Sequence, residues 1–449
     1  MGLAAHKRRI KTLIVGLGKT GLSCARFLTA HGEEIAVTDS REHPPGLKDL
    51  RAMLPDAAVF LGGFSEDALK HADRVVLSPG VAAGTPFIAK ARALGLPVMG
   101  DIELFAHYAR APVVGITGSN GKSTVTTVLG NMAEKAGRAA RVGGNLGTPA
   151  LDLLKQAEPE LYVLELSSFQ LEITESLECA AATVLNISPD HMDRYTDLQQ
   201  YAAAKARIFR SCGTAVLNRE DPEVCGMGGG AKRRVSFGLD APAAGDYGLA
   251  GQGPAEWLMR GTEQLMPVSA LAMRGRHNLA NALAALALGE AVGLPMPAML
   301  DVLQEFRGLP HRMEYVATVG GAVYYDDSKG TNLGATLAAV AGVSQPLVLI
   351  AGGDAKGQDF APLAEALKGK ARAVVLLGKD APLLEQAFAG RVKTQKAKDM
   401  DGAVQVATEL AKAGDMVLLS PACSSLDMFE NFEHRGRVFA AAVRRLAGE

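Results

Sequence analysis

The segment "GITGSNGKST", residues 115–124, joins an apolar run at residues 112–116 to a helical pattern that begins at Thr124. A glycine-rich turn between a strand and a helix directs backbone N–H groups and a helix N-terminus at one anion. The common phosphate-loop template requires glycine where Ile116 stands, and glycine and asparagine also form ordinary turns. Five suitable residues nevertheless coincide here: Gly118, Gly121, Lys122, Ser123 and Thr124. We therefore predict a phosphate loop whose lysine contacts the outer phosphates and whose serine contacts magnesium.

Short apolar, β-branched runs alternate with alanine- and leucine-rich stretches along the chain, which is the pattern of parallel sheets covered by helices. The predicted fold class is therefore α/β. Because 449 residues are too many for one core, several domains are expected. The motifs divide the chain into three domains, residues 1–100, 101–308 and 309–449. Residues 226–254 have weak periodicity and receive no assignment.

The overall charge is nearly balanced, with 47 Lys and Arg against 48 Asp and Glu. No bulk field would attract nucleic acid or an anionic membrane, so an anionic ligand must be bound by local geometry. The apolar run Leu13–Leu17 follows a basic start but is too short for a signal-peptide core, and no segment approaches membrane-spanning length. Five cysteines lie far apart without zinc-like or redox-like spacing, which indicates reduced thiols in a cytoplasmic protein.

The first domain contains a glycine pattern of the dinucleotide-binding type. Gly16, Gly18 and Gly21 follow a strand, and Asp39 ends the next strand. The pattern suits a diphosphate at a helix N-terminus and a carboxylate on a ribose or base, so NAD and UDP both fit. Arg41 is either a solvated loop charge or a nucleotide contact. Alternatively, the glycines serve only close packing of strand and helix.

Two strand ends of the central domain carry candidate metal ligands. Glu165 ends the apolar strand "LYVLE" at the carboxyl edge, where ligands of open α/β sheets bind, and its carboxylate can hold magnesium. A helix-capping or salt-bridging glutamate is the alternative. His191 follows a second strand end, although a lone histidine is usually structural and imidazole is a poor ligand for magnesium.

Lys205 lies in the helical segment "LQQYAAAKARIF" on the same face as Tyr201, Ile208 and Phe209. Burial on such a face would lower the pKa of the amine. A neutral amine can capture carbon dioxide and become a carbamate, which is an anionic metal ligand. The alternative is a lysine whose stem lies on the apolar face while its ammonium group reaches water.

The last domain has polar residues after several strands. Lys329 and Lys356 each follow a strand, so they form a candidate anion site, although each one alone is more often a surface charge. A further strand-to-helix turn adds Ser425 and Phe432. Arg312 lies at the junction with the central domain, where a cation could act on ATP only when the domains close.

Taken together, thirteen ordered motifs are similar to those of the Mur ligases, most closely the D-glutamate-adding branch. The motifs are "GLGKTGLS", "TDSREHPPGL", "SPG", "GITGSNGKST", "GGNLGTP", "ELSSFQL", "DHMDRY", "QQYAAAK", "GRHNLANALAA", "GLPHRME", "DDSKGTN", "GGDAKGQDF" and "SPACSSLDMFENFEHRG". They cover almost the whole chain apart from residues 226–254. The phosphate loop of that family has the same short glycine spacing, so Ile116 is no departure from its pattern.

The resemblance implies a Rossmann-like domain for the UDP-sugar, a central P-loop ATPase-like domain and a C-terminal Rossmann-like domain for the amino acid. It also implies an ATP-dependent ligase that adds D-glutamate to UDP-N-acetylmuramoyl-L-alanine through an acyl phosphate, in cytoplasmic peptidoglycan precursor synthesis. ATP and magnesium at two sites are the implied cofactors. The two substrates are the implied partners, with no nucleic acid, no membrane span and a monomeric state.

The resemblance also assigns site residues. The ATP set is Gly118, Ser119, Asn120, Gly121, Lys122, Ser123, Thr124, Asn278, Asn281, Arg312, Asp327 and Lys329. The UDP-sugar set is Lys19, Thr20, Asp39, Ser40, Arg41, Gly80, Asn145 and Ser167. The D-glutamate set is Thr331, Lys356, Ser425, Leu426 and Phe432. Ser123 and Glu165 serve one magnesium ion, and His191 with carbamylated Lys205 serves a second. The catalytic residues are Lys122, Glu165, His191 and Lys205.

Two other classes of protein remain as alternatives from the residues alone. An NAD-dependent dehydrogenase would explain the first domain but would leave the phosphate loop and Lys205 without a role. A P-loop switch protein would explain the central domain and would bind ATP without turnover. Phosphate release in the presence of both implied substrates distinguishes the three.

Overall fold

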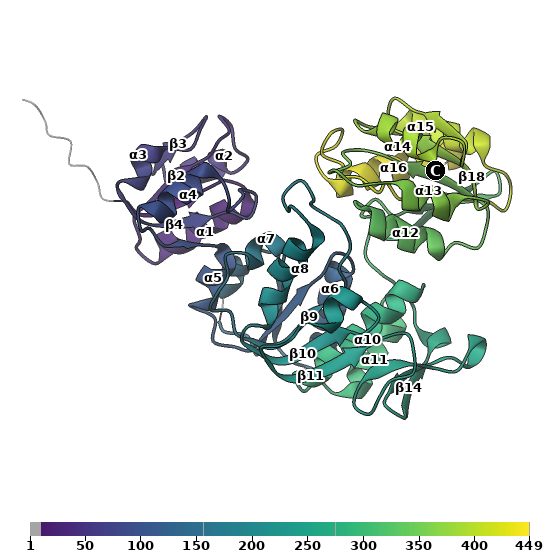
Figure 1. The fold of residues 1–449 in the computed structure, drawn as a ribbon, viewed down its shortest axis with the longest axis horizontal. Coiled ribbons are helices and arrows are strands. Elements are labelled where there is room, and N and C mark those ends of the chain that lie inside the picture. Colours follow the sequence, from purple (N-terminus) through teal and green to yellow (C-terminus); the bar gives the residue numbers. More distant parts are fainter. Residues whose placement is uncertain (1–9, 156, 274, 449) are drawn as a thin grey trace, which may run out of the picture. The chain divides into compact units, whose positions relative to one another are not determined.

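The computed structural model describes residues 10–155, 157–273 and 275–448 and contains three separate sheets (Figure 1). The basic start of the chain, residues 6–9, lies outside the described residues. Each sheet is mainly parallel and covered by helices, so the predicted α/β class with three domains is confirmed. The described residues form two compact units, one within Met1–Asn186, Tyr201–Val268 and Asn281–Leu303, and the other within Ile187–Gln200, Ser269–Ala280 and Gln304–Glu449.

The first sheet has five parallel strands in the order β3-β2-β1-β4-β5. Its strands are β1 Ile10–Val15, β2 Ile35–Thr38, β3 Ala58–Phe60, β4 Ala72–Leu77 and β5 Val98–Met99. The accompanying helices are α1 Lys19–Ala30, α2 Leu47–Met53, α3 Glu66–Leu69, α4 Pro86–Ala93 and α5 Asp101–Ala106. β-Branched residues on both faces of β1 and β4 are fully buried, as expected for a parallel sheet between helices.

The central sheet has nine strands in the order β14-β13-β12-β11-β10-β9-β6-β8-β7. Its strands are β6 Val113–Thr117, β7 Ala140–Gly144, β8 Leu161–Glu165, β9 Cys179–Val184, β10 Cys212–Asn218, β11 Ala231–Phe237, β12 Tyr247–Ala250, β13 Trp257–Arg260 and β14 Glu263–Pro267. Its α-helices are α6 Lys122–Lys135, α7 Ser168–Leu171, α8 Leu198–Ala206, α9 Pro222–Cys225, α10 Arg276–Ala291 and α11 Met296–Glu305. The short 3-10 helices are Ala150–Lys155, Arg207–Phe209, Gly253–Ala255 and Val268–Ala270.

The segment at residues 226–254, which the sequence left unassigned, contains β11 and β12. β11 continues the parallel part of the sheet, while β12, β13 and β14 form an antiparallel meander at its edge. The strands are short and the intervening residues are rich in glycine and alanine, so the alternating apolar pattern is weak.

The third sheet has six strands in the order β15-β16-β20-β17-β18-β19, with only the β15–β16 pair antiparallel. Its strands are β15 Glu314–Val319, β16 Ala322–Asp326, β17 Leu347–Ala351, β18 Ala371–Leu376, β19 Thr394–Lys396 and β20 Met416–Leu419. Its helices are α12 Leu333–Ala341, α13 Ala361–Leu367, α14 Ala381–Phe388, α15 Met400–Leu410 and α16 Phe432–Ala447.

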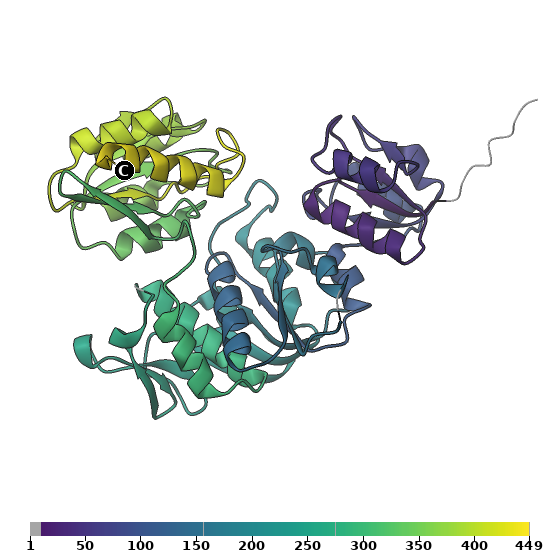
Figure 2. The ribbon, with the colours of Figure 1, turned by 180° about the vertical axis from the view of Figure 1, so that it is seen from behind.

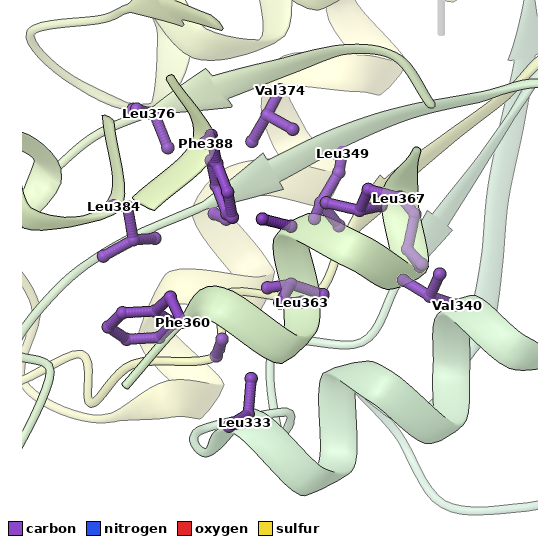
Figure 3. Close-up of a cluster of buried hydrophobic side chains, with 14 of the residues drawn as sticks. Leu333, Val340, Leu349, Phe360, Leu363, Leu367, Val374, Leu376, Leu384 and Phe388 are labelled. Atoms are coloured by element: carbon purple, nitrogen blue, oxygen red, sulfur yellow. The ribbon is translucent and has the colours of Figure 1, made fainter. Parts of the chain in front are cut away.

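Two apolar clusters cover the two faces of the third sheet. On one face, α12, α13 and α14 pack their apolar side chains against β17 and β18, with Phe360, Leu363 and Phe388 at the centre (Figure 3). On the other face, α15 and α16 pack against the alternate residues of the same strands. Figure 2 shows α16, in yellow, lying along this sheet. The carboxyl ends of the strands are thereby held in fixed positions for the turns that carry the polar residues.

Two general features complete the fold. Four cysteines, Cys24, Cys179, Cys212 and Cys423, are buried free thiols, and Cys225 is an exposed one. None of the described helices is long and apolar enough to cross a bilayer.

Candidate active site

The predicted phosphate loop connects β6 to α6 at the carboxyl edge of the central sheet. α6 begins at Lys122, two residues before the predicted start at Thr124, so the helix N-terminus reaches further into the loop than the sequence suggested. Gly118 (φ 146°) and Gly121 (φ 86°) adopt left-handed backbone conformations that favour glycine. Gly121 provides no side-chain cap for the helix. The N-terminus of α6 therefore begins at a residue without a capping side chain, as at many anion-binding helix termini.

Two lysines converge on one carbonyl oxygen of this loop. Lys122 Nζ donates to Gly118 O (2.8 Å) and Ser119 O (2.8 Å), while Lys205 Nζ donates to the same Gly118 O (2.9 Å). Two ammonium groups on a single oxygen repel one another, and an anion close to both would offset that repulsion. The loop therefore combines a helix N-terminus with two positive side chains.

Lys205 is buried, with 1% of its surface exposed, so the alternative of an ammonium group that reaches water is wrong. It lies in α8 with its Nζ 4.6 Å from the Tyr201 ring centroid and 3.3 Å from Thr117 Oγ1. Tyr201, Ile208 and Phe209 are buried as predicted, but α8 ends at Ala206, so Ile208 and Phe209 lie in the following 3-10 helix rather than on the same α-helix. A carbonyl oxygen and an aromatic face are partners for an ammonium group. The carbamate is therefore an open prediction for this residue.

Glu165 lies at the end of β8 with 3% of its surface exposed. Its Oε1 accepts a hydrogen bond from Asn145 Nδ2 at 2.7 Å, which brings together two residues that the sequence assigned to different ligands. Its Oε2 is buried and makes no hydrogen bond within residues 10–155, 157–273 and 275–448. A buried carboxylate oxygen without a donor calls for an additional partner. A hard oxygen-preferring cation such as Mg²⁺ fits this donor.

His191 belongs to the second compact unit, next to a partly buried ion pair. It has a left-handed backbone (φ 58°), and its Nε2 lies 3.7 Å from Asp190 Oδ2. Asp190 pairs with Lys356 (Nζ to Oδ1, 2.6 Å) and accepts from Asn332 Nδ2 (3.1 Å). Burial by itself would raise the pKa of Asp190, but the charges of Lys356 and His191 and the hydrogen bonds from Lys356 and Asn332 lower it to about 2. Asp190 is thus held as a carboxylate, and it was not among the residues predicted from the sequence.

The first-domain glycine loop is organised around Asp39. Asp39 Oδ2 accepts from Leu17 N at 2.7 Å, and Oδ1 accepts from Arg41 N and Nε at 2.9 Å. Burial raises the pKa of Asp39, but the hydrogen bonds from Arg41 and Leu17 outweigh this effect and lower it. A Cβ at Gly21 would lie 2.0 Å from Gly16 O, so close packing alone requires this glycine. Arg41 is paired with Asp39 in this structure.

The other members of the predicted UDP-sugar set lie at strand or helix ends of the first compact unit. Lys19 begins α1 and donates to Gly147 O at 2.5 Å. Ser167 caps α7 in a reciprocal arrangement with Gln170, whose amide also donates to buried Asp101. Three further members, at the start of α1 and after β2 and β4, are Thr20, Ser40 and Gly80. The capping role of Ser167 is compatible with a second role toward a ligand.

The second unit brings two predicted residues into direct contact. Lys329 Nζ lies 3.7 Å from the centroid of the Phe432 ring at the start of α16, a cation–π contact. Asp327, nearby in the chain, accepts from Ser420 Oγ at 2.7 Å, and burial raises its pKa to about 7. The remaining predicted residues of this unit differ in exposure. Ser425 is buried, Leu426 is 71% exposed, Thr331 and Asn278 are half-buried, and Arg312 lies between left-handed His311 and Met313. Asn281, of the first unit, is buried in α10.

Arg435 is a buried cation that the sequence did not single out. Only 1% of it is exposed, and it donates to Ser328 Oγ (3.0 Å), Ser328 O (2.8 Å) and Cys423 O (3.1 Å). Burial lowers its pKa to about 10. The arginine thereby joins the turn after β16 to the turn after β20. On an amphipathic helix an arginine is expected to be exposed, so the periodicity of α16 gave no signal for it.

Three family models match successive parts of the chain. They are the Mur ligase MurD-like N-terminal domain at residues 10–100, the Mur ligase middle domain at residues 116–289 and the Mur ligase glutamate ligase domain at residues 311–423.

Curated relatives match over nearly their whole length. The UDP-N-acetylmuramoylalanine–D-glutamate ligase of Nitrosococcus oceani is 56% identical over 97% of this chain and 96% of its own. The enzyme of the same name from Methylococcus capsulatus is 53% identical over 98% and 95%. Among solved structures, the UDP-N-acetylmuramate-alanine ligase MurC of Thermotoga maritima has a TM-score of 0.62 at 19% identity, covering 98% of this chain and 100% of its own. The ADP complex of MurF ligase from the same organism has a TM-score of 0.61 at 16% identity, covering 98% and 96%. These structures share the fold.

Proposed function

The chain belongs to the Mur ligase family, and we propose on that basis that it adds D-glutamate to UDP-N-acetylmuramoyl-L-alanine at the expense of ATP. The observation that carries this proposal is the 56% identity to a D-glutamate ligase over 97% of the chain. The protein is an ATP-dependent, amide-bond-forming ligase of peptidoglycan synthesis. We place it in the cytoplasm as a monomer, with domains at residues 1–100, 101–308 and 309–449.

The reaction explains why the chain needs a phosphate site. A carboxylate does not react with amines at neutral pH. Transfer of the ATP γ-phosphoryl group to the carboxylate of UDP-N-acetylmuramoyl-L-alanine gives ADP and an acyl phosphate, which has a good leaving group. The amine of D-glutamate then attacks the acyl carbon, the amide forms, and inorganic phosphate leaves with loss of the amine proton. Positioning and charge neutralisation are the main tasks of the protein.

The phosphate loop is the best-supported part of the ATP site. Its left-handed glycines, helix N-terminus and two convergent lysines suit the charge of a triphosphate. We assign ATP contacts to these residues: Gly118, Ser119, Asn120, Gly121, Lys122, Ser123, Thr124, Asn278, Asn281, Arg312, Asp327 and Lys329. Asp327 with a raised pKa would suit contact with a hydroxyl or base group better than with a phosphate.

Magnesium, when bound, would neutralise phosphate charge and orient the phosphoryl oxygens. Ser123 and Glu165 are the proposed ligands of one ion, and the buried Glu165 Oε2 without a hydrogen bond to any described residue supports this role. His191 and carbamylated Lys205 are the proposed ligands of a second ion. Lys122, Glu165, His191 and Lys205 are the proposed catalytic residues.

The remaining sets divide between the two substrates. We assign the UDP-sugar to Lys19, Thr20, Asp39, Ser40, Arg41, Gly80, Asn145 and Ser167. We assign D-glutamate to Thr331, Lys356, Ser425, Leu426 and Phe432. The cationic Lys356 suits a carboxylate of the amino acid, which is the reason for giving it the leading role in that set.

The test is phosphate release from Mg-ATP with UDP-N-acetylmuramoyl-L-alanine and one amino acid at a time. Release that requires both the nucleotide sugar and D-glutamate is expected, with L-glutamate, D-alanine and L-alanine inactive. Activity with a different amino acid would overturn the substrate, and ATP binding without release would favour a switch protein. Calorimetry with UDP and NAD separates the dehydrogenase alternative, since we expect binding of UDP and none of NAD.

A further inference from the structure

We propose that Asp190 is a positioning residue that fixes the ammonium group of Lys356 for a carboxylate of the incoming amino acid. This inference rests on the proposed function, in which Lys356 contacts D-glutamate. Both residues belong to the second compact unit, so the pair lies within one unit of the chain. Asp190 follows β9 in the sequence, whereas Lys356 follows β17.

Both residues of the ion pair are largely buried, and Asp190 makes further hydrogen bonds. Lys356 Nζ lies 2.6 Å from Asp190 Oδ1, with side-chain exposures of 15% and 9%. Asp190 Oδ1 also accepts from His191 N at 2.9 Å, and Oδ2 accepts from Asn332 Nδ2 at 3.1 Å. Asn332 is itself fixed, because its Oδ1 caps α12 through Ala335 N at 2.9 Å. The carboxylate is therefore held by three donors and cannot rotate without losing several hydrogen bonds.

The backbone of Lys356 gives independent support. Lys356 has φ 51° in the left-handed region, where a residue with a Cβ is disfavoured. Its N–H donates to Asp354 Oδ1 at 3.1 Å, which stabilises the turn, and the next residue, Gly357, also has a positive φ. A turn that keeps lysine rather than glycine at a strained position is consistent with a side-chain requirement there. The side chain leaves this turn toward Asp190.

Charge and geometry decide what the pair can do. An ammonium group has three N–H donors, and the contact with Asp190 uses one direction. The pair is neutral overall, so Asp190 weakens the long-range attraction of Lys356 for anions. The ion pair also fixes the long Lys356 side chain before the amino acid binds. Less rotamer freedom is therefore lost on binding. Asp190 therefore acts mainly through Lys356, because three of the roughly four acceptor positions of its carboxylate are already used.

The experiment measures KM and kcat for wild type, Asp190→Asn, Asp190→Glu, Lys356→Ala and the Asp190→Asn/Lys356→Ala double variant, varying D-glutamate and ATP separately. Asp190→Asn keeps the shape but removes the charge, and we expect KM for D-glutamate to rise about tenfold while KM for ATP stays within twofold. Asp190→Glu should recover part of the loss. In the Lys356→Ala background, Asp190→Asn should have no further effect on KM for D-glutamate. The matched control is Asp401→Asn, which breaks the exposed Asp401–Arg445 ion pair and should change neither constant.

Three results would overturn the inference. A lower KM for D-glutamate in Asp190→Asn would make Asp190 a competitor for Lys356. Additive effects in the double variant would show that Asp190 acts independently of Lys356. An unchanged KM in a folded Asp190→Asn enzyme would remove the role altogether. If wild type releases no phosphate with D-glutamate, the proposed function fails first, and that outcome is separate from these three.

Discussion

The first and central domains each place a glycine-rich loop between a parallel strand and a helix, yet side chains of different charge contact the backbones of the two loops. In the first loop, a carboxylate of Asp39 accepts from the N–H of Leu17. In the central loop, ammonium groups of Lys122 and Lys205 donate to the carbonyl of Gly118. The same local pattern therefore makes a site that favours hydroxyl or N–H groups next to Asp39 and a site that favours phosphate next to Lys122. Glycine spacing indicates the backbone path, and the contacting side chains decide the ligand.

The largest expected effect is the loss of the central cation. Lys122→Ala should lower ligation by at least about a thousandfold, because it removes a charge from a phosphoryl-transfer site, while the fold survives. Phosphate release measures the ligation activity, and the thermal unfolding midpoint shows whether the fold survives. Lys135→Ala, on the exposed C-terminal turn of the same helix, is the control and should retain activity. Near-normal turnover by folded Lys122→Ala would contradict the assignment of the central loop to phosphate.

The second effect concerns the charge that Lys205 carries. Lys205→Ala should nearly eliminate ligation, since the residue is buried against the phosphate loop. If Lys205 is carbamylated, formate or acetate should restore part of the activity by supplying an anion, and methylamine or ethylamine should not. Restoration by amines alone would instead support the ammonium contacts with Gly118 O and Tyr201, and both lysines would then act as cations.

A stability difference of intermediate size should separate two glycines of the first loop. A Cβ at Gly21 would meet Gly16 O at 2.0 Å, whereas a Cβ at Gly18 would meet no heavy atom within 4 Å. Gly21→Ala should therefore destabilise by about 1–3 kcal/mol, and Gly18→Ala by less than about 0.5 kcal/mol. Thermal and urea unfolding provide the measurement. Equal stabilities would show that the loop can shift to accept a methyl group.

The smallest effect is the pH dependence of the carboxylate in the first loop. Because the pKa of Asp39 is lowered in the folded protein, its charged form contributes stability above the unfolded pKa of about 4, and this contribution is lost as the pH falls through the folded pKa. Asp39→Asn should cost about 1–2 kcal/mol at pH 7 and progressively less below about pH 4. Unfolding midpoints of both proteins between pH 3 and 8 measure the gap. A stability difference between wild type and Asp39→Asn that grows as the pH falls would contradict the lowered pKa of Asp39.

Much of the fold and part of the site follow from local sequence. The strands around the phosphate loop are continuous apolar runs, and the glycines occur where left-handed conformations are needed. The apolar residues near Lys205 indicate a buried stem, whereas the burial of its ammonium group was one of two alternatives. Such features depend on neighbours within about ten residues, which a single sequence contains.

The features that were missed depend on distant or atypical contacts. The Asp190–Lys356 pair joins residues 166 positions apart, so neither motif alone indicates it. Arg435 is buried because it bonds the turns after β16 and β20, although its helix predicts exposure. The β12–β14 meander follows short strands with little apolar alternation. In each case the tertiary structure, rather than local preference, determines the conformation.

The burial of the cysteines has a practical consequence. Burial raises the pKa of Cys24, Cys179, Cys212 and Cys423 above the usual thiol range, to about 11 for Cys212 and about 12 for Cys423. Maleimides and iodoacetamides react with accessible thiolates, so these four should react slowly in the folded protein. Cys225, at the end of α9, is exposed. A fluorophore can therefore be attached at one native position, giving a labelled protein whose rotational motion can be followed without any substitution.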